Sequence, residues 1–183
     1  MIIASLSEEI SFEKRISITP EIAKKYISEG FDINLCRNYG NHLGFNDNEY
    51  SSLGVNIVND EKELIDNANI LIQLSLPNEN KTNLLKADQI LIGVLNSYEN
   101  KKKLIPLIEK KVKMFSLEML PRITRAQSMD ILSSQANLAG YKAVVESFAN
   151  FQKVIPMMMT AAGTVPAAKV LVVGAGVAGL QAI

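Results

Sequence analysis

The sequence predicts an α/β fold with a parallel sheet, and three observations lead to that prediction. Short apolar runs alternate with amphipathic segments through the first 150 residues. Several of these runs are apolar almost throughout, which is expected of strands whose sheet is covered on both faces. All charged residues except Lys153 and Lys169 precede residue 151, so a different kind of domain is expected to begin near that point.

Six runs rich in Ile, Val and Leu are the predicted strands of the first domain. They are Ile2–Leu6, Phe31–Leu35, Val55–Val58, Ile70–Leu74, Ile90–Leu95 and Val112–Leu117. The first helix is expected over Glu21–Glu29. Thr19 suits its N-cap, Pro20 suits the first helical position, and Gly30 suits the residue after its end.

Further helices are expected between the later strands. One lies between Asp47 and Gly54, one begins at Asp60, and one covers Tyr98–Lys111 with its lysines turned to solvent. A long helix is predicted over Gln135–Phe151, because apolar residues recur there at spacings of three and four. These residues are Leu138, Tyr141, Val144, Val145, Phe148 and Phe151.

Composition excludes several classes of protein. A formal net charge of zero and a pI near 6.6 argue against a nucleic-acid partner held by bulk charge. The single Cys36 excludes a disulfide framework and a zinc site built on cysteines. After Lys169 the uncharged tail has 14 residues, whereas a helix needs about 20 apolar residues to cross a bilayer. We therefore expect no signal peptide, no metal site and no direct membrane insertion.

The strongest motif is a glycine-rich turn near the end of the chain. A predicted strand, Lys169–Val173, leads into Gly-x-Gly-x-x-Gly, and a helix-compatible stretch follows. In a dinucleotide-binding turn the first glycine permits the sharp bend, the second admits the pyrophosphate, and the third lets the helix pack closely. The expected cofactor-binding residues are Gly174, Ala175, Gly176, Val177 and Gly179. The alternative is a buried glycine-rich turn without a ligand.

This turn alone does not distinguish NAD, NADP and FAD. The acidic residue that holds the adenosine ribose is expected about 20 positions later, near position 195, whereas the sequence ends at Ile183. The second domain is therefore expected to be incomplete. We expect three parts: 1–134 as an N-terminal Rossmann-like α/β domain, 135–165 as a bridging helix and linker, and 166–183 as the start of a dinucleotide-binding Rossmann domain.

A second candidate site follows the last predicted strand of the first domain. Two of the four arginines, Arg122 and Arg125, lie there with Gln127, Asp130 and Ser133. Ligands of open α/β sheets bind beyond the carboxyl ends of strands, and amide and carboxylate groups could clamp a carboxamide. An ordinary Asp/Ser helix cap with arginine–aspartate surface pairing is the alternative, which the residues by themselves favour.

Two long stretches resemble a known family. LEMLPRITRAQSMDILSSQANLAGYKAV and MMMTAAGTVPAAKVLVVGAGVAGLQAI resemble the NAD(H)-binding component of proton-translocating NAD(P) transhydrogenase. RISITPE, residues 15–21, resembles the start of that family's first helix. The resemblance implies two Rossmann-like domains with the nucleotide between them. Arg122, Gln127, Asp130 and Ser133 would then hold the nicotinamide, and the turn at Gly174–Gly179 would hold the pyrophosphate.

The resemblance also implies a function. NADH on this component would pass hydride to NADP⁺ on a partner component, coupled to proton translocation by a membrane-spanning component. Direct hydride transfer needs two oriented rings and no general acid or base, so we expect no catalytic residue. The family further implies a homodimer on the cytoplasmic face of the membrane, attached through its partners.

Alanine dehydrogenases, which belong to the same superfamily, are the main alternative. They resemble this chain at Arg15, which binds the substrate carboxylate there. They also carry a Lys near the end of the fourth strand and a His after the fifth, where this chain has Gln73 and Val94. His42, the single histidine, is expected in a surface turn. The residues are also compatible with a flavoprotein, or with a fragment that has no activity by itself.

Overall fold

The computed structural model describes all residues from 1 to 183. The chain forms two compact units, Met1–Leu120 and Pro121–Ile183. The domain expected over 1–134 overlaps both units, and the three-part division stays a prediction.

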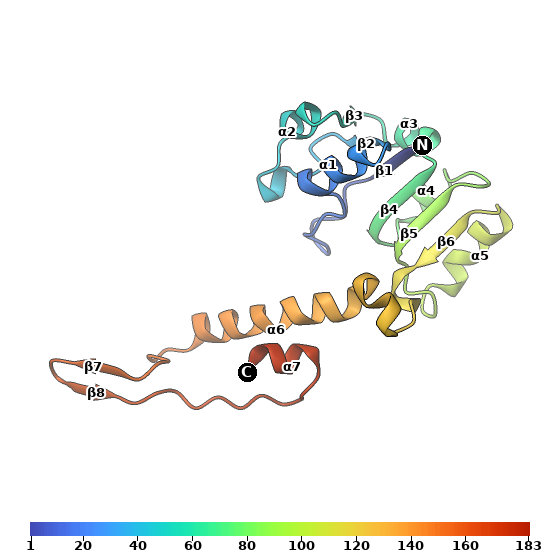
Figure 1. The fold of residues 1–183 in the computed structure, drawn as a ribbon. Coiled ribbons are helices and arrows are strands. Elements are labelled where there is room, and N and C mark those ends of the chain that lie inside the picture. The colour runs from blue at the N-terminus through green and yellow to red at the C-terminus, as the bar shows by residue number, and fades with distance from the viewer. The chain divides into compact units, whose positions relative to one another are not determined.

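The first unit confirms the predicted parallel sheet (Figure 1). Its six strands are β1 (Ile2–Ser5), β2 (Asp32–Cys36), β3 (Asn56–Val58), β4 (Ile70–Ser75), β5 (Ile90–Val94) and β6 (Lys113–Ser116). All pairs are parallel, in the order β3-β2-β1-β4-β5-β6. The chain winds outward from β1 to β3 and then returns to place β4 beside β1. This reversal creates the switch point at which open α/β sheets bind ligands.

Helices and short turns connect the strands. They are α1 (Pro20–Ser28), η1 (Asn41–Leu43), α2 (Asp47–Ser52), α3 (Glu61–Asn67), α4 (Glu79–Thr82), α5 (Lys101–Glu109) and η2 (Leu117–Met119). Thr19 and Asp60 cap α1 and α3 as expected, because each side chain accepts a backbone N–H of the first turn. Asn46, rather than Asp47, caps α2. The short helix α4 was not predicted.

The core lies on both faces of the sheet. Ile33 and Leu35 of β2, Leu71 of β4 and Leu91 of β5 are almost completely buried. Their burial explains why the strands are apolar runs instead of alternating patterns. Helix α5 buries Leu104 and Leu107 against this core.

The second unit consists of a loop, two helices and a hairpin. Its elements are η3 (Thr124–Met129), α6 (Ile131–Asn150), β7 (Met158–Thr160), β8 (Gly163–Val165) and α7 (Val177–Ala182). Helix α7 packs along α6 (Figure 1). Strands β7 and β8 pair antiparallel, and Gly163 at their turn has a φ of 127°. The hairpin was not predicted.

Two expectations for the second unit are wrong. The long helix begins at Ile131 instead of Gln135, because Asp130 supplies its cap. Residues 169–173 form no strand, because no other strand lies beside them to complete a hydrogen-bonded ladder. The recurring apolar residues of α6 are largely exposed, and Gly140 is the one buried residue of the helix.

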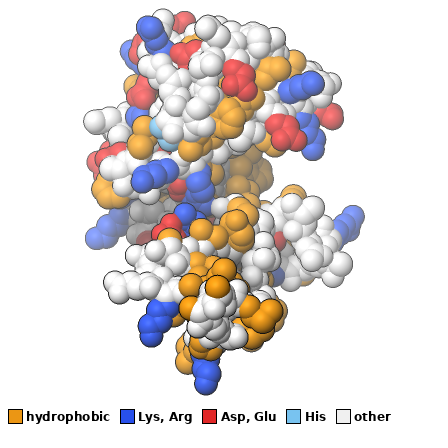
Figure 2. All heavy atoms as spheres, turned by 90° about the vertical axis from the view of Figure 1, so that its left-hand side faces the viewer, with side chains coloured by type: hydrophobic (Ala, Val, Ile, Leu, Met, Phe, Trp, Pro, Cys, Tyr) orange, Lys and Arg blue, Asp and Glu red, His pale blue; other side chains and the backbone are white.

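Exposed apolar side chains therefore characterise the surface of the second unit. Figure 2 shows such side chains on one face of the molecule. Those of the second unit include Leu138, Tyr141, Phe148, Met157, Met159, Leu171 and Val173. Helix α6 has 20 residues, but no helix of the chain is both long and apolar enough to cross a bilayer.

Candidate functional site

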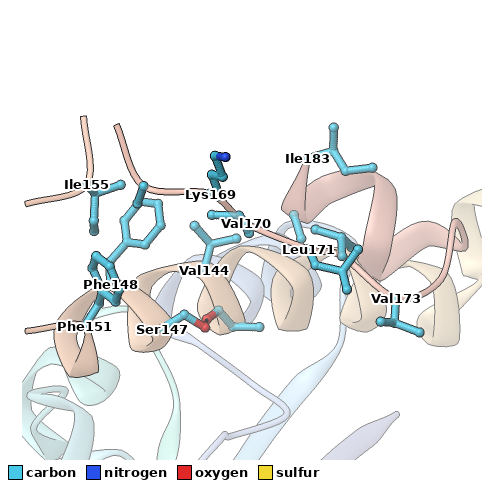
Figure 3. Close-up of a pocket in the computed structure, with 14 residues that line it drawn as sticks. Val144, Ser147, Phe148, Phe151, Ile155, Lys169, Val170, Leu171, Val173 and Ile183 are labelled. Atoms are coloured by element: carbon cyan, nitrogen blue, oxygen red, sulfur yellow. Dashed lines mark hydrogen bonds between the residues drawn. The ribbon is translucent and has the colours of Figure 1, made fainter. Parts of the chain in front are cut away.

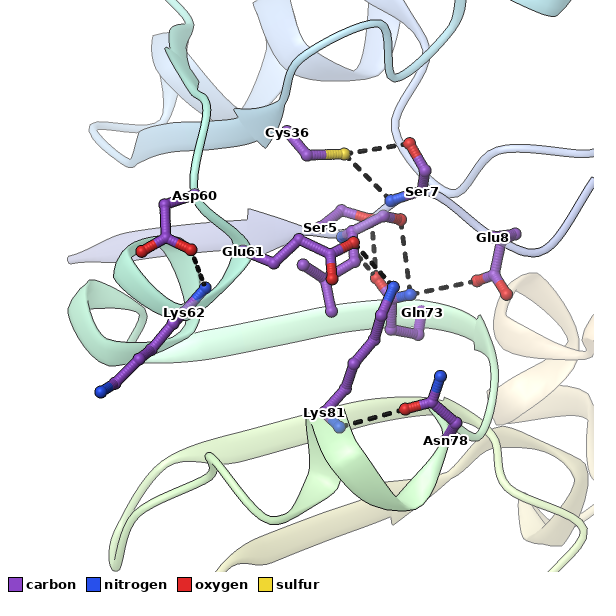
Figure 4. A network of polar contacts seen from close by, with 11 residues as sticks. Ser5, Ser7, Glu8, Cys36, Asp60, Glu61, Lys62, Gln73, Asn78 and Lys81 are labelled. Atoms are coloured by element: carbon purple, nitrogen blue, oxygen red, sulfur yellow. Dashed lines mark hydrogen bonds and ion pairs between the residues drawn. The ribbon is translucent and has the colours of Figure 1, made fainter.

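A buried polar network occupies the switch point of the first unit. Gln73, which is 3% exposed, accepts hydrogen bonds at Oε1 from the Leu6 N–H (2.7 Å) and the Ser5 hydroxyl (3.0 Å). The Ser5 hydroxyl also contacts the hydroxyls of Ser17 and Tyr39. Gln73 thus joins β4 to β1 from inside the sheet (Figure 4). No buried side-chain polar atom of the chain lacks a partner.

Glu8 closes the same edge from the loop after β1. Its Oε1 accepts the backbone N–H of Leu74 at 2.7 Å, and its Oε2 accepts the hydroxyl of Ser75. The Gln73 amide donates to the same carboxylate at 3.4 Å (Figure 4). A carboxylate of the chain itself therefore binds the backbone N–H groups at the end of β4.

A cavity of about 400 Å³ opens beside this network. Glu8, Glu13, Gln73 and Lys81 are among its lining residues. Arg15 pairs with Glu13 at 2.6 Å, and its hydrogen bond lowers the pKa of the Glu13 carboxyl. The cavity thus lies where an α/β sheet would take a substrate, and the carboxylates of Glu8 and Glu13 are held by internal partners.

The structure also places the residues that separate the two superfamily alternatives. Strand β4 ends at Ser75 and β5 ends at Val94, and neither a lysine nor a histidine occurs over 70–76 or 90–98. The Lys and His that the alanine dehydrogenase resemblance implies are therefore absent at these strand ends, even if the alignment is shifted by a few residues. His42 is exposed in η1 and contacts the carbonyl of Lys14 at 2.8 Å, which confirms its expected place in a surface turn.

Cys36 is held inside the first unit. Its Sγ lies 3.0 Å from both the backbone nitrogen and the hydroxyl of Ser7. Burial raises the pKa of the thiol, so the group stays protonated and unreactive near neutral pH. The cysteine consequently has a packing role.

A second carboxylate, which sequence reasoning missed, gathers the ends of β5 and β6. Glu118 accepts the N–H groups of Leu95 (3.2 Å) and Ser97 (3.0 Å) and the hydroxyl of Ser116 (2.6 Å). Partial burial acts to raise the pKa of Glu118, but these hydrogen bonds outweigh it and hold the pKa below its usual value. The signal for its role was its position directly after a strand.

Asp130 and Ser133 form the cap of α6. The Asp130 carboxylate accepts the backbone N–H of Ser133 at 3.0 Å and the Ser133 hydroxyl at 2.7 Å. The hydroxyl bond, the backbone bond and the charge of Arg122 all lower the pKa of Asp130, so it is ionised near neutral pH. The structure therefore brings these two predicted residues together. Their contact is that of a helix cap, which was the alternative to a nicotinamide contact.

Arg122 and Gln127 belong to the same unit and the same loop. Both side chains are exposed, and Gln127 lies in η3, directly before the cap. The Gln127 carbonyl accepts the Asp130 N–H at 3.2 Å, which closes the last turn of η3. All four predicted loop residues thus lie at the N-terminal end of one helix, where a ligand could reach them. Their role in binding stays a prediction.

The glycine turn has the backbone that its spacing predicts. Gly174 has a φ of 111°, which favours glycine, and no atom lies within 4 Å of a Cβ built at Gly174 or Gly176. A Cβ at Gly179 would overlap the Gly174 carbonyl oxygen, so α7 packs directly on the turn. The first and second glycines leave open space, and the third permits the close approach. Residues in this arrangement suit a pyrophosphate, which needs backbone N–H groups without intervening side chains.

Gly140 is a further residue that sequence reasoning missed. A Cβ at this position would overlap the backbone carbonyl of Ala178 in α7. Beside it, the Asn137 amide donates to Gln181 Oε1 at 2.7 Å. A glycine inside a helical pattern lowers helix stability, which is the signal that could have indicated a close contact.

An apolar groove of about 590 Å³ lies between α6 and the run that precedes the glycine turn. Figure 3 shows Val144 and Phe148 of α6 on one side of it and Leu171 on the other. Its lining is apolar except for Ser147 and Lys169, so it has the character of unfilled packing space. The chain has no group of His, Cys, Asp and Glu side chains arranged to hold a metal ion.

These features define an α/β protein with a Rossmann-like parallel-sheet domain followed by the start of a second Rossmann domain. Residues 5–139 match the family model described as "Alanine dehydrogenase/PNT, N-terminal domain". Residues 143–183 match "Alanine dehydrogenase/PNT, C-terminal domain". The chain belongs to the alanine dehydrogenase/PNT family.

Curated relatives carry the name that the resemblance implied. A protein of Rickettsia prowazekii, named as the first part of NAD(P) transhydrogenase subunit alpha, is 40% identical over the whole chain, which covers 49% of that protein. The protein of the same name from Rhodospirillum rubrum is 39% identical, with the same coverage. An alanine dehydrogenase from Methanococcus maripaludis is 25% identical over the whole chain. The chain spans about half the length of these relatives.

Solved structures agree with this assignment. The transhydrogenase from Sinorhizobium meliloti superposes with a TM-score of 0.93 and 38% identity, over all of this chain and 54% of that one. An L-alanine dehydrogenase superposes with a TM-score of 0.80 at 20% identity, which shows a shared fold. The resemblance to the transhydrogenase component is thereby confirmed.

Proposed function

We propose that this chain is the NAD(H)-binding component of an NAD(P) transhydrogenase. One observation carries the proposal: a single compact unit holds both the loop with Arg122, Gln127 and Asp130 and the open glycine turn at Gly174–Gly179. The names of the relatives from Rickettsia prowazekii and Rhodospirillum rubrum support the same assignment.

The residues present fit a dinucleotide. The open space at Gly174 and Gly176 leaves backbone groups accessible to a pyrophosphate, and Gly179 allows the helix to follow directly. Gln127 offers both a donor and an acceptor to the nicotinamide carboxamide, and ionised Asp130 offers an acceptor to its NH₂ group. Arg122 supplies positive charge beside them. Bound NADH supplies the hydride that leaves this component.

The chain's contribution to the reaction is then orientation. The loop residues would hold and orient the nicotinamide for hydride transfer to NADP⁺ on a partner component, which needs near-attack geometry and no protein acid or base. The absence of Lys and His at the strand ends of the first unit suits this role and disfavours an alanine dehydrogenase. An assay with alanine and pyruvate distinguishes the two activities.

The proposal extends to the assembly. Two copies of the component pair with an NADP-binding component and a membrane-spanning component, and hydride transfer is coupled to proton translocation through the latter. The component stays on the cytoplasmic face and reaches the membrane through its partners.

Asp130→Asn tests the role of the loop in the full-length protein. Asparagine is also a good helix cap, so the melting temperature is expected to stay nearly unchanged. The variant loses the charged acceptor for the carboxamide, so hydride transfer from NADH to an NADP⁺ analogue on the partner component is expected to fall about tenfold or more.

Ser134→Ala is the matched control, because Ser134 lies in the same first turn and its hydroxyl bonds the Ile131 carbonyl. We expect it to transfer hydride normally. Full activity of Asp130→Asn would remove Asp130 from the proposed site.

A further inference from the structure

Helix α6 connects the two parts of the proposed NAD(H) site. Its N-terminal end carries the Asp130 cap, and Gly140 lies nine residues after Ile131, about 14 Å along the helix axis. At Gly140 the helix contacts α7, which begins directly after Gly176 of the glycine turn. The loop and the turn are thus joined through one continuous helix within the second unit.

The contact at Gly140 is tight and specific. Only a residue without a Cβ lets the Ala178 carbonyl approach this closely, because a methyl group would overlap backbone atoms that have no freedom to rotate away. The Asn137–Gln181 hydrogen bond, one turn earlier on α6, is a second contact between the two helices. Gly140 is the one buried residue of α6, so its contact with Ala178 marks the place where α7 docks, and the exposed Asn137–Gln181 pair lies beside it.

We propose that Gly140 and the Asn137–Gln181 pair are positioning residues that fix the distance between the nicotinamide loop and the pyrophosphate turn. This inference rests on the proposed function. A dinucleotide that contacts both sites gains affinity from their preset spacing, as two linked ligands do. A ligand that contacts the turn alone gains nothing from that spacing.

The test is Gly140→Ala in the full-length protein, with NADH and ADP titrated separately by calorimetry. Alanine favours helix over glycine, so without the contact the variant would be more stable and would bind normally. With the contact, α7 must shift. NADH affinity is then expected to fall about 10- to 100-fold, because the two sites no longer have the spacing that lets one ligand contact both. ADP affinity is expected to change less than about threefold.

Ala139→Ser is the matched control, because it adds one atom to an exposed neighbour on the same helix. We expect it to bind both ligands as the unaltered protein does. Equal losses of NADH and ADP affinity in Gly140→Ala would overturn the spacing role, and so would unchanged binding of both. If the unaltered protein itself fails to bind NADH, that result contradicts the proposed function and not only the role of the spacing.

A second variant covers the case in which Gly140→Ala does not fold. Asn137→Ala removes only the hydrogen bond to Gln181, and we expect the same selective loss of NADH affinity, reduced to a few-fold. Gln181→Ala should match it, and the double variant should lose no more than either single one, because both remove one interaction. Additive losses would contradict a shared positioning role.

Discussion

Gln73 is the residue at which the resemblance predicts a departure of the first unit from an amino-acid dehydrogenase. A lysine there would bring a charge into a site that is 3% exposed, whereas the glutamine is neutral and satisfies the Leu6 N–H and the Ser5 hydroxyl. The carboxylate of Glu8 binds the neighbouring strand end. At the residue scale, the polar side chains at the switch point of the first unit form hydrogen bonds within the chain.

Glu118 gives a prediction about pH. Its folded-state pKa is lower than its ordinary value of 4.5, so the ionised carboxylate stabilises the folded protein above that pH. This stabilisation is lost as the pH falls through the folded-state pKa. Glu118→Gln should therefore be less stable than the unaltered protein at pH 7, and the difference should shrink toward pH 3.

Urea unfolding at several pH values measures this difference. Glu109→Gln is a suitable control, because Glu109 is exposed at the end of α5. A gap between Glu118→Gln and the unaltered protein that stays constant from pH 7 to pH 3 would contradict the assigned hydrogen bonds.

The residue types of the candidate site could be predicted, but their contacts could not. Asp130 and Ser133 are compatible in sequence with either a cap or a nicotinamide contact, and the structure shows the cap. Spacing reveals a local bond three residues away, because helix geometry fixes it. The partners of Gln73 are more than 60 residues distant, and only the fold brings them together.

At the scale of elements, the glycine turn makes a two-part prediction. Gly176→Ala adds a methyl group to open space, so the melting temperature should hardly change while NADH affinity falls. Gly179→Ala forces a methyl group against the Gly174 carbonyl, so both stability and affinity should fall. Thermal melting and NADH titration of the two variants measure both effects.

The two variants test different parts of the assignment. Normal NADH binding by Gly176→Ala would show that no ligand approaches the turn at this glycine. An unchanged melting temperature for Gly179→Ala would contradict the close packing of α7 on the turn.

The inner strands of the first unit, β1, β2, β4 and β5, were predictable because their apolar runs are buried or half-buried on both faces of one sheet. The run at residues 169–173 has the same composition, yet it forms no strand, because strand formation needs a partner that composition does not supply. The β7–β8 hairpin was missed for the converse reason. Its strands are short and exposed, so they carry no hydrophobic pattern.

At the scale of the whole molecule, the two units differ in what they contain. The first unit is a six-stranded sheet whose strand ends are bound by Glu8 and Glu118. The second carries the exposed loop, the open glycine turn and most of the exposed apolar surface. We therefore propose that the second unit binds the dinucleotide, through backbone groups and a few side chains. The net charge of zero suits this mode of recognition.

Calorimetric titration of the full-length protein with NADH and with NADPH tests the central proposal most directly. We predict that NADH binds about tenfold or more tightly than NADPH, and that Gln127→Ala weakens NADH binding by a similar factor. Preference for NADPH, or unchanged NADH binding by Gln127→Ala, would contradict the assignment of this chain as the NAD(H)-binding component.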